Sequence, residues 1–461
     1  MTESRAGEHV PDEEPPASTE PPVTLVEGTT FAVSGRSGDM NADGAEGLFF
    51  RDVRILSTWR LRLDEGPLEV LTVLPGEPFR TTFLARVPPR SSSTEVLVER
   101  RRSVGDGMRE DLRVRNLGVE PVAVRVTLEI DSDFADLFAV KEGRVRDRAE
   151  VTAATDGDAV VLTLRGGARD LGVRIAAAGA RARPGLLVVD LRLPPHGEWT
   201  TAIMVTPVVD GAEVEPAFPA GRPVEESLPA QRLHRWRTGG PRVETADTDL
   251  LRTLRQSRED LGALRLVDPV HPGSVAVAAG APWFMALFGR DSLLSSYLAL
   301  SLDPTLALGT LQTLARLQGT TVDPRTEEQP GRILHETRLG ADFPLAAGGG
   351  QVYYGTADAT PLFVLLAGEL RQWGIAPEQV DALLPHVERA LAWIGNYGDS
   401  DGDGFVEYRR STGVGLVNQG WKDSWDGVNF ADGTLAEAPI ALCEVQGYVY
   451  AAYVARSHLA A

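Results

Sequence analysis

The sequence predicts a protein of two parts, an antiparallel β-sandwich followed by a partial helical toroid. From about residue 23 to residue 220, apolar side chains alternate with polar ones, which is the period of a β-strand. After Thr245 the apolar residues recur at helical spacing instead. The chain has 461 residues, more than one ordinary core accommodates, so two or three domains are expected.

The first segment, residues 1–21, is rich in proline, glutamate and serine and has few large apolar side chains. Such a composition cannot bury enough surface to offset the entropy of ordering, so a disordered tail is expected. This segment also lacks the basic start and apolar run of a signal peptide. No apolar stretch approaches the roughly 20 residues that cross a bilayer. We therefore expect a cytoplasmic protein without a membrane partner.

Residues 22–220 are expected to form the sandwich. The stretch PVAVRVTLEI places Val122, Val124, Val126 and Leu128 on one face of a strand. The same alternation recurs in DAVVLTLRG, LGVRIAAAG and LLVVDLRLPP, with glycine, aspartate or proline between the runs. Many short strands with regular turn signals are typical of an antiparallel sandwich. This region contains no tight cluster of candidate catalytic residues, so we expect it to serve packing.

Residues 221–245 mix proline, glycine and charges, and are predicted to be a linker. Residues 246–461 then contain about six predicted helices, several of which start at Asp, Pro or Thr and end at Gly. The loops between these helices carry Trp, Tyr, Asp, Glu, His and Arg. Paired helices joined by such loops are typical of a helical toroid, and we expect the functional site in these loops.

The formal net charge of −19 argues against partners that carry phosphate or anionic lipid, so nucleic acid is not an expected partner. A neutral polymer such as a glucan feels little of this field. Cys443 is the only cysteine, which excludes an intrachain disulfide and a thiol-based metal site. The chain also has no GxSxG sequence, no Walker loop and no dinucleotide fingerprint after a strand.

The stretch NQGWKDSWDG, residues 418–427, places Trp421 and Trp425 around Asp423. Flat aromatic faces beside acids suit a sugar ring and a proton donor. An inverting glycosidase needs one protonated carboxyl near the glycosidic oxygen and one carboxylate that activates water. The acid must be partly desolvated so that its pKa rises. We expect the two indoles to give Asp423 that environment, with Lys422 facing away or binding substrate. The alternative is a surface loop whose tryptophans pack on a neighbour.

The stretch APWFMALFGRDSLL places Trp283, Arg290 and Asp291 where a loop enters a helix. Arg290 can donate several hydrogen bonds and Asp291 can accept two, which suits neighbouring sugar hydroxyls. The alternative is that Asp291 caps the helix and Arg290 is its surface partner. In YYGTADATPLF, Tyr354 precedes Asp358, which is expected at a helix N-cap and is also able to contact sugar.

The stretch GRILHETR contains His335 and Glu336 but lacks the second histidine of an HExxH zinc site. We interpret it as polar lining of a pocket or as a plain surface loop. In DSDGDGFVEY, Asp399, Asp401 and Asp403 have the spacing of a calcium loop, but residue 410, where an EF-hand needs glutamate, is arginine. Glu407 comes too early for that role. An Asp/Gly turn is therefore favoured, and no metal is predicted.

Five stretches in this order resemble bacterial glycogen-debranching (amylo-α-1,6-glucosidase-like) proteins: PWFMALFGRDSLL, YYGTADATPLF, DSDGDGFVEY, NQGWKDSWDG and PIALCEVQGYVYAAY. Those proteins belong to the six-hairpin glycosidase superfamily, with glucoamylases and trehalases. Residues 47–64 and 111–138 resemble the β-sandwich that precedes the helical barrel in that family. The resemblance extends from about Val23 to the C-terminus.

The resemblance implies roles for particular residues. Arg290 and Asp291 would hold the non-reducing sugar, and Asp423 would be the general acid, with Asp426 and Glu444 as alternatives because the loop register is uncertain. The substrate-binding residues expected in all are Trp283, Arg290, Asp291, Glu336, Tyr354, Asp358, Trp421, Lys422, Asp426 and Glu444.

The function implied is that of an inverting hydrolase that releases glucose at the α-1,6 branch points of glycogen or related α-glucans, without a cofactor. One alternative is a trehalase or another α-glucosidase. Another is an inactive carbohydrate-binding fragment that lacks the base. Family toroids pair twelve helices, so residues 246–461 are expected to be the first half of an (α/α)6 domain. The catalytic base is then expected beyond residue 461, and the exposed helix faces are expected to self-associate or to be covered by the missing half.

Overall fold

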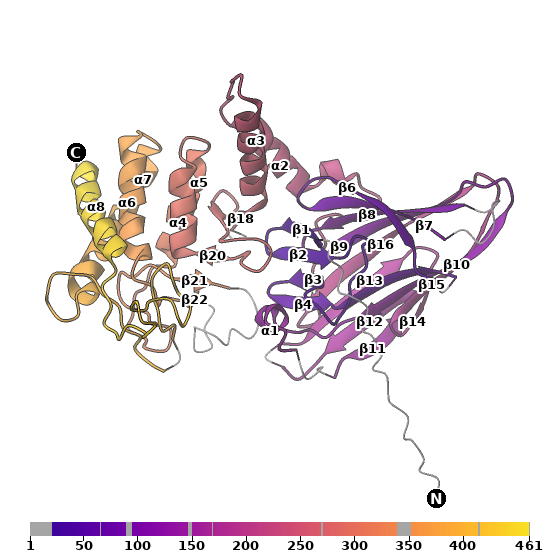
Figure 1. Cartoon of the computed structure of the whole chain (residues 1–461), viewed down its shortest axis with the longest axis horizontal. Coiled ribbons are helices and arrows are strands. Elements are labelled where there is room, and N and C mark those ends of the chain that lie inside the picture. The colour runs from indigo at the N-terminus through magenta and orange to yellow at the C-terminus, as the bar shows by residue number, and fades with distance from the viewer. Residues whose placement is uncertain are drawn as a thin grey trace, which may run out of the picture.

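The computed structural model describes residues 21–460 except 65, 89–94, 146–149, 168, 269–270, 339–351 and 414. The predicted disordered tail, residues 1–21, lies outside the described residues apart from Pro21. Figure 1 shows strands gathered in one part of the molecule and long helices in the other. The predicted order of an antiparallel sheet domain followed by a helical region is confirmed.

Three antiparallel sheets form the first part. The largest has the order β11 (Thr152–Asp156), β12 (Ala159–Leu164), β13 (Leu171–Ala177), β16 (Glu198–Val209), β9 (Met108–Asn116), β8 (Val96–Val104), β7 (Arg80–Arg86) and β6 (Glu69–Pro75), with β17 (Ala212–Glu213) beside β16. The second has the order β14 (Arg181–Arg183), β15 (Leu186–Leu193), β10 (Val122–Asp131) and β5 (Thr58–Leu63). The third runs β1 (Val23–Glu27), β2 (Thr30–Ser34), β3 (Gly47–Phe50) and β4 (Val53–Leu56).

One hydrophobic core joins these sheets into a sandwich. In β10, Val124, Val126 and Leu128 are buried while the residues between them are more exposed, as the alternation predicts. Their cluster also includes Val98 from the largest sheet and Leu48 from the third sheet. The inward faces of all three sheets therefore share the same interior, which is the arrangement of a β-sandwich.

Helices dominate the second part. They are α2 (Leu228–Gly239), α3 (Thr248–Ala263), α4 (Gly289–Leu298), α5 (Pro304–Arg316), α6 (Ala359–Gln372), α7 (Pro377–Trp393) and α8 (Cys443–Leu459), with the short turns η1 (Val224–Glu226) and η2 (Ile394–Gly398). The short helix α1 (Leu137–Lys141) lies within the first part, between β10 and β11. Within the described residues, six α-helices follow residue 245, which agrees with the predicted number. Their closure into a toroid and the predicted domain boundaries stay predictions.

The segment predicted as a linker contains helix α2. Ser227 caps its first turn, and Leu233 and Trp236 are buried at helical spacing. The indole nitrogen of Trp236 donates to the carbonyl of Arg258 at 2.8 Å, which ties α2 to α3. The sequence analysis missed this helix because only these two large side chains anchor an otherwise charged stretch.

Helix α6 lies at the centre of the helical part and packs against α4, α5, α7 and α8. Nearly all of its side chains from Ala359 to Leu370 are buried. This packing places the N-terminus of α6 close to that of α4. Two short antiparallel sheets lie at the same end: β18 (Arg265–Val267) with β19 (Val275–Val277), and β20 (Leu287–Phe288), β21 (Glu336–Thr337) and β22 (Val352–Tyr353).

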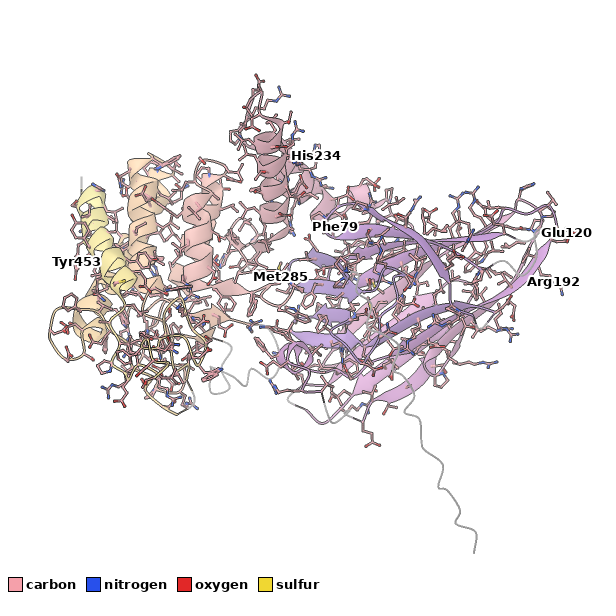
Figure 2. All side chains as sticks on the ribbon, in the orientation of Figure 1. Phe79, Glu120, Arg192, His234, Met285 and Tyr453 are labelled. Carbon is pink, nitrogen blue, oxygen red and sulfur yellow. The ribbon has the colours of Figure 1, made fainter. Side chains whose placement is uncertain are left out.

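Aromatic packing joins the two parts of the molecule. The Trp283 ring meets Phe31 and Phe49 of the sandwich edge to face, with ring centroids 5.8 and 5.6 Å apart. Met285 is buried in the same cluster, and Figure 2 shows it where the sandwich meets the helical part. The Trp283 ring is half-buried and packs between the two parts, and its place in a sugar pocket stays a prediction.

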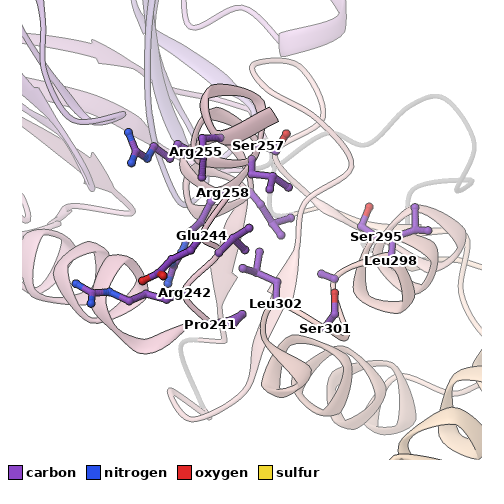
Figure 3. A pocket seen from close by; sticks show the side chains of 15 residues that line it. Pro241, Arg242, Glu244, Arg255, Ser257, Arg258, Ser295, Leu298, Ser301 and Leu302 are labelled. Carbon is purple, nitrogen blue, oxygen red and sulfur yellow. The ribbon is translucent and has the colours of Figure 1, made fainter. Parts of the chain in front are cut away.

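An apolar groove of about 920 Å³ lies between α3, with the segment before it, and the end of α4. Figure 3 shows side chains from both elements around it, among them Arg258, Leu298 and Leu302. Leu298 is 78% exposed, and at the other end of the row of helices Tyr450 of α8 is 73% exposed. The predicted self-association stays a prediction. Among the described residues, no helix is both long and apolar enough to cross a membrane.

Candidate active site

Arg290, in the first turn of α4, is the centre of a cluster of carboxylates from three segments. Its Nη1 donates to Oδ2 of Asp358 at 3.1 Å and to the carbonyl of Gly420 at 2.8 Å. Its Nη2 donates to Oδ2 of Asp423 at 3.1 Å and lies 3.5 Å from Oδ2 of Asp291. The alternative of a surface pair between Arg290 and Asp291 is excluded, because the Arg290 side chain is only 11% exposed.

The carboxylates around Arg290 stabilise its charged form. Burial disfavours the charged guanidinium, but Asp358, Asp291 and Asp423 outweigh it and raise the pKa of Arg290. Burial also raises the pKa of Asp291; the Arg290 charge opposes this rise, and repulsion from Asp358 and Asp423 adds to it. Burial therefore favours the protonated form of Asp291.

Asp358 occupies the N-cap position of α6 but does not cap the helix. Its side chain makes no cap hydrogen bond, and its backbone is already helical. It accepts instead from the Thr356 hydroxyl at 2.5 Å and from Arg290. The Asp358 carboxylate is thus buried against a cation and does not cap the helix. This environment favours a place in the cluster over a capping role.

The loop that carries Asp423 is anchored by residues that the sequence analysis did not single out. Asn418 and Gln419 are buried, and the Asn418 amide donates to the carbonyl of Ser424 at 2.6 Å. Arg332 donates to the Gln419 side chain at 2.9 Å. Burial lowers the pKa of Arg332 to about 10, although nearby acidic groups oppose the change. The polar residues N-Q-G before the first tryptophan were the signal for this anchor.

The two indoles do not enclose Asp423 as expected. Trp421 is 59% exposed and Trp425 is 72% exposed, and the Asp423 side chain itself is 38% exposed. The Lys422 ammonium lies 5.3 Å from the centre of the Trp421 ring, so this lysine contacts the indole. The prediction that the indoles desolvate Asp423 was wrong. The loop is anchored by the polar residues at its start, Asn418 and Gln419, and its tryptophans stay at the surface.

His335 and Glu336 lie on the predicted pocket-lining stretch, and both are buried. The Nε2 atom of His335 is 4.0 Å from Oδ2 of Asp423. Burial and the charges of Arg290, Arg332 and Arg338 lower the pKa of His335 to about 3, so its ring is neutral near pH 7. Burial raises the pKa of Glu336, and Arg338 opposes this change. The alternative of a plain surface loop is excluded.

The remaining predicted residues occupy different environments. Tyr354 is buried in the helical core, where its hydroxyl donates to the carbonyl of Leu317 at 2.8 Å, so it does not line a sugar pocket. Asp426 is exposed and accepts from the Ser424 hydroxyl at 2.8 Å. Glu444 lies in the first turn of α8. Burial raises the pKa of Tyr448, one turn later; Asp358 and Glu444 add to this rise, and Arg290 opposes it.

The predicted Asp/Gly turn is formed. Backbone N–H groups of Gly402 and Phe405 donate to Asp399 and Asp403 at 2.7 and 2.9 Å. Side-chain oxygens of Asp399, Asp401, Asp403 and Glu407 lie within 4.8 Å of one another, although Glu407 does not occupy the loop position of the EF-hand glutamate. Glu407 is buried and accepts from the backbone N–H of Ser400 at 2.6 Å.

Gly289, directly before Arg290, is needed for the close approach of three segments. A Cβ atom at this position would lie 2.2 Å from the carbonyl oxygen of Leu334 and 2.7 Å from Cβ of Ala359. We expect Gly289→Ala to lower the free energy of unfolding by about 1–3 kcal/mol through overpacking. Urea unfolding would measure this loss, with Gly395→Ala as a control because no atom lies within 4 Å of its added Cβ. Equal stability of the two variants would contradict the tight approach at Gly289.

Residues 25–204 match the family model for the N-terminal domain of (some) glycogen debranching enzymes. This match confirms the resemblance noted for the sandwich. It ends before Arg290, so it does not test the roles of the residues in the cluster. None of the curated proteins compared with this chain matches it.

Among solved structures, a protein assigned as a kojibiose phosphorylase from the human microbiome aligns with a TM-score of 0.46 and 9% identity, over 83% of this chain. This chain spans 57% of that protein's length. A galactose mutarotase related enzyme from Lactobacillus acidophilus aligns with a TM-score of 0.27 and 9% identity, over 42% of this chain and 99% of its own. Heparinase III aligns with a TM-score of 0.20 and 12% identity, over 40% of this chain and 30% of its own.

Proposed function

We propose that this chain is a carbohydrate-active enzyme, an inverting glycoside hydrolase that releases glucose from α-1,6 branch points of α-glucans. The observation that carries the proposal is the guanidinium of Arg290, which bridges Asp358 and Asp423 beside Asp291. A fixed fork of donors beside several carboxylate acceptors suits the alternating hydroxyls of a glucose ring. The match of residues 25–204 to a debranching-enzyme domain supports the same substrate class.

In the proposed mechanism, Arg290 and Asp291 hold the hydroxyls of the terminal glucose, and Asp358 fixes the orientation of Arg290. Asp423 donates its proton to the glycosidic oxygen as the bond from that oxygen to C1 breaks. A water molecule attacks C1 from the opposite face and loses its proton to a second carboxylate. The products are glucose of inverted configuration and a shortened glucan.

Asp291 is the alternative acid, and a specific observation favours it. Burial raises its pKa, which is a property that a general acid requires. Asp291 also lies farther from Arg290 than Asp423 does, at 3.5 Å against 3.1 Å. We retain Asp423 as the acid because it belongs to the loop that resembles the acid loop of the family.

Release of glucose tests the proposed function. The full chain is incubated separately with phosphorylase-limit dextrin, trehalose and maltotriose, and glucose is measured enzymatically over time. Faster release from limit dextrin than from trehalose would support the proposal. Release from trehalose alone would replace it by a trehalase. No release from any substrate, with retention of the chain in a gel that contains glycogen, would indicate a carbohydrate-binding protein.

The exposed indole of Trp425 is expected to contact glucan units beyond the cleaved bond. Because this ring is 72% exposed two residues from Asp423, a flat sugar face can stack on it. Trp425→Ala is expected to raise KM for limit dextrin about tenfold, a loss of roughly 1.4 kcal/mol, with little change for a disaccharide. Trp373→Ala, which removes an exposed indole at the C-terminal end of α6, is the control. Equal KM values for the two variants would exclude this role.

The cytoplasmic location and the absence of a nucleic acid partner are also proposals, and they rest on the sequence alone. The net charge of −19 supports the second, because it repels a phosphate backbone.

A further inference from the structure

A buried arginine joins the sandwich to the candidate site. Arg338 directly follows β21, and its side chain is only 1% exposed. Its Nε donates to Oε2 of Glu336 at 2.9 Å, and its Nη1 donates to Oδ1 of Asp52 at 3.4 Å. Glu336 belongs to the helical part, whereas Asp52 belongs to the turn between β3 and β4 of the sandwich. The guanidinium therefore links one carboxylate from each part.

The sandwich presents Asp52 in a fixed position. Asp52 and its neighbour Arg51 both have positive φ values, 65° and 49°, which define a tight turn. The carbonyl of Asp52 accepts from the backbone N–H of Leu137 at 2.9 Å, which ties this turn to α1. The next residue of α1, Phe138, places its ring 4.5 Å from the Arg338 guanidinium. The sandwich thus offers Arg338 both an anion and an aromatic face.

Glu336 lies at the wall of the candidate site. It pairs with Phe288 across β20 and β21, and Phe288 is two residues before Arg290. Burial raises the pKa of Glu336; the charge of Arg338 opposes this rise, and Asp52 and Asp423 add to it. The last contribution means that Glu336 and Asp423 share one electrostatic environment. The titratable groups around Glu336 are Arg338 on its own segment, Tyr353 on β22, Asp52 on the sandwich and Asp423 on the loop at 418–427.

We propose that Asp52 is a positioning residue that acts through Arg338 to hold Glu336 at the wall of the sugar site. This inference rests on the proposed function, and it gives the sandwich a part in the active site besides packing. A buried guanidinium needs anions on more than one side to offset its desolvation. With Asp52 present, Arg338 lies between two carboxylates. Arg338 holds Glu336 in place, and Asp52 shares in balancing the charge of the guanidinium.

The pH dependence of the site follows from this arrangement. Asp52 raises the pKa of Glu336, so removal of its charge lowers that pKa. Asp52 then no longer offsets the charge of Arg338 beside Glu336, which lowers the pKa of Glu336 further. In Asp52→Asn, the limb of the activity profile that reports ionisation of Glu336 is expected to move to lower pH by about half a unit or more. The effect should fall on kcat more than on KM, because Asp52 does not contact the sugar.

The test compares Asp52→Asn, Asp52→Glu and Glu225→Gln in the full chain. Glu225 is the control because it also makes an ion pair with the sandwich. It lies in η1, pairs with Arg80 of β7 at 2.9 Å and is 70% exposed. The pH profiles of glucose release from limit dextrin are recorded for each variant. A kcat loss of tenfold or more with a shifted limb in Asp52→Asn, partial rescue in Asp52→Glu and no change in Glu225→Gln would support the inference. An unshifted limb with equal activity in all three would overturn it.

A structural measurement separates this inference from the proposed function. If the wild-type chain releases no glucose, the proposed hydrolase fails, and crystal structures of wild type and Asp52→Asn still report the position of Glu336. Displacement of the Glu336 carboxyl or of Arg338 in the variant would support the positioning role of Asp52. An unchanged contact between Arg338 and Glu336 would overturn it whatever the chain catalyses.

Discussion

Asp423→Asn is expected to lower the rate of glucose release by about 10²–10⁴-fold while the sugar still binds, because an amide cannot transfer the proton that a general acid supplies. The amide oxygen can still accept from Arg290, so the loop and the cluster should persist. Initial rates on limit dextrin and calorimetric titration with an isomaltooligosaccharide would measure the two effects separately. The affinity is expected to stay within about threefold of wild type, a difference of roughly 0.7 kcal/mol.

Asp426→Asn is the matched control for this variant. Asp426 lies three residues later in the same loop, is exposed and accepts a hydrogen bond from the Ser424 hydroxyl. Because Asp426 is an alternative acid of this loop, near-normal rates in its variant would leave the acid role with Asp423. Asp291→Asn discriminates the alternative acid: if it removes turnover with binding kept while Asp423→Asn is active, the acid role belongs to Asp291. Unchanged hydrolysis in Asp423→Asn would remove Asp423 from the mechanism.

Arg290→Met is expected to have the largest effect on stability and to abolish sugar binding. Asp358 is 1% exposed, and loss of Arg290 leaves its carboxylate with Thr356 as its remaining side-chain donor. Breaking a buried ion pair from one side costs about 3–5 kcal/mol. Urea unfolding would measure this loss, and titration with the oligosaccharide would measure the loss of binding. Arg290→Lys keeps the charge but lacks the fork, so it should lose less stability and still bind sugar poorly.

Arg316→Met is the control for Arg290→Met. Arg316 lies at the end of α5, is 34% exposed and pairs with Asp268 at 2.5 Å. Because solvent screens this pair, its loss should cost less than about 1 kcal/mol. Equal destabilisation by the two variants would show that Arg290 is an ordinary ion-pair residue and not the centre of a buried cluster.

The periodicity of the sequence was enough to predict the order of the two parts. Alternation places Val124, Val126 and Leu128 on the buried face of β10, and it depends only on the strand period. The prediction for α2 failed because a helix with two apolar anchors in a charged stretch gives a weak periodic signal. Leu233 and Trp236 acquire their meaning only through packing with α3 and the sandwich.

The candidate site could be predicted in part. Arg290, Asp358 and Asp423 were singled out from separate stretches, and the fold brings them into hydrogen-bonding contact. The aromatic residues were predicted less well. Trp283 and Tyr354 have the residue types of a sugar pocket, but one packs against the sandwich and the other is buried in the helical core. A sequence shows which side chains can stack on sugar, but not whether the fold needs the same surface for packing.

Residues that act through others were the hardest to predict. Asn418 and Gln419 hold the loop of Asp423 by hydrogen bonds to residues near in sequence and to Arg332, which is far from them in sequence. Asp52 meets Arg338 across 286 residues of chain. No periodicity or spacing relates such positions, because the contact is made only when the sandwich and the helical part pack together.

A crystal structure of Asp423→Asn with a branched α-glucan oligosaccharide tests the central claim most directly. The account predicts the terminal glucose on Arg290 and Asp291, with the α-1,6 oxygen within hydrogen-bonding distance of the side chain at position 423. A sugar seated elsewhere, for example in the groove between α3 and α4, or a glycosidic oxygen remote from position 423, would contradict it.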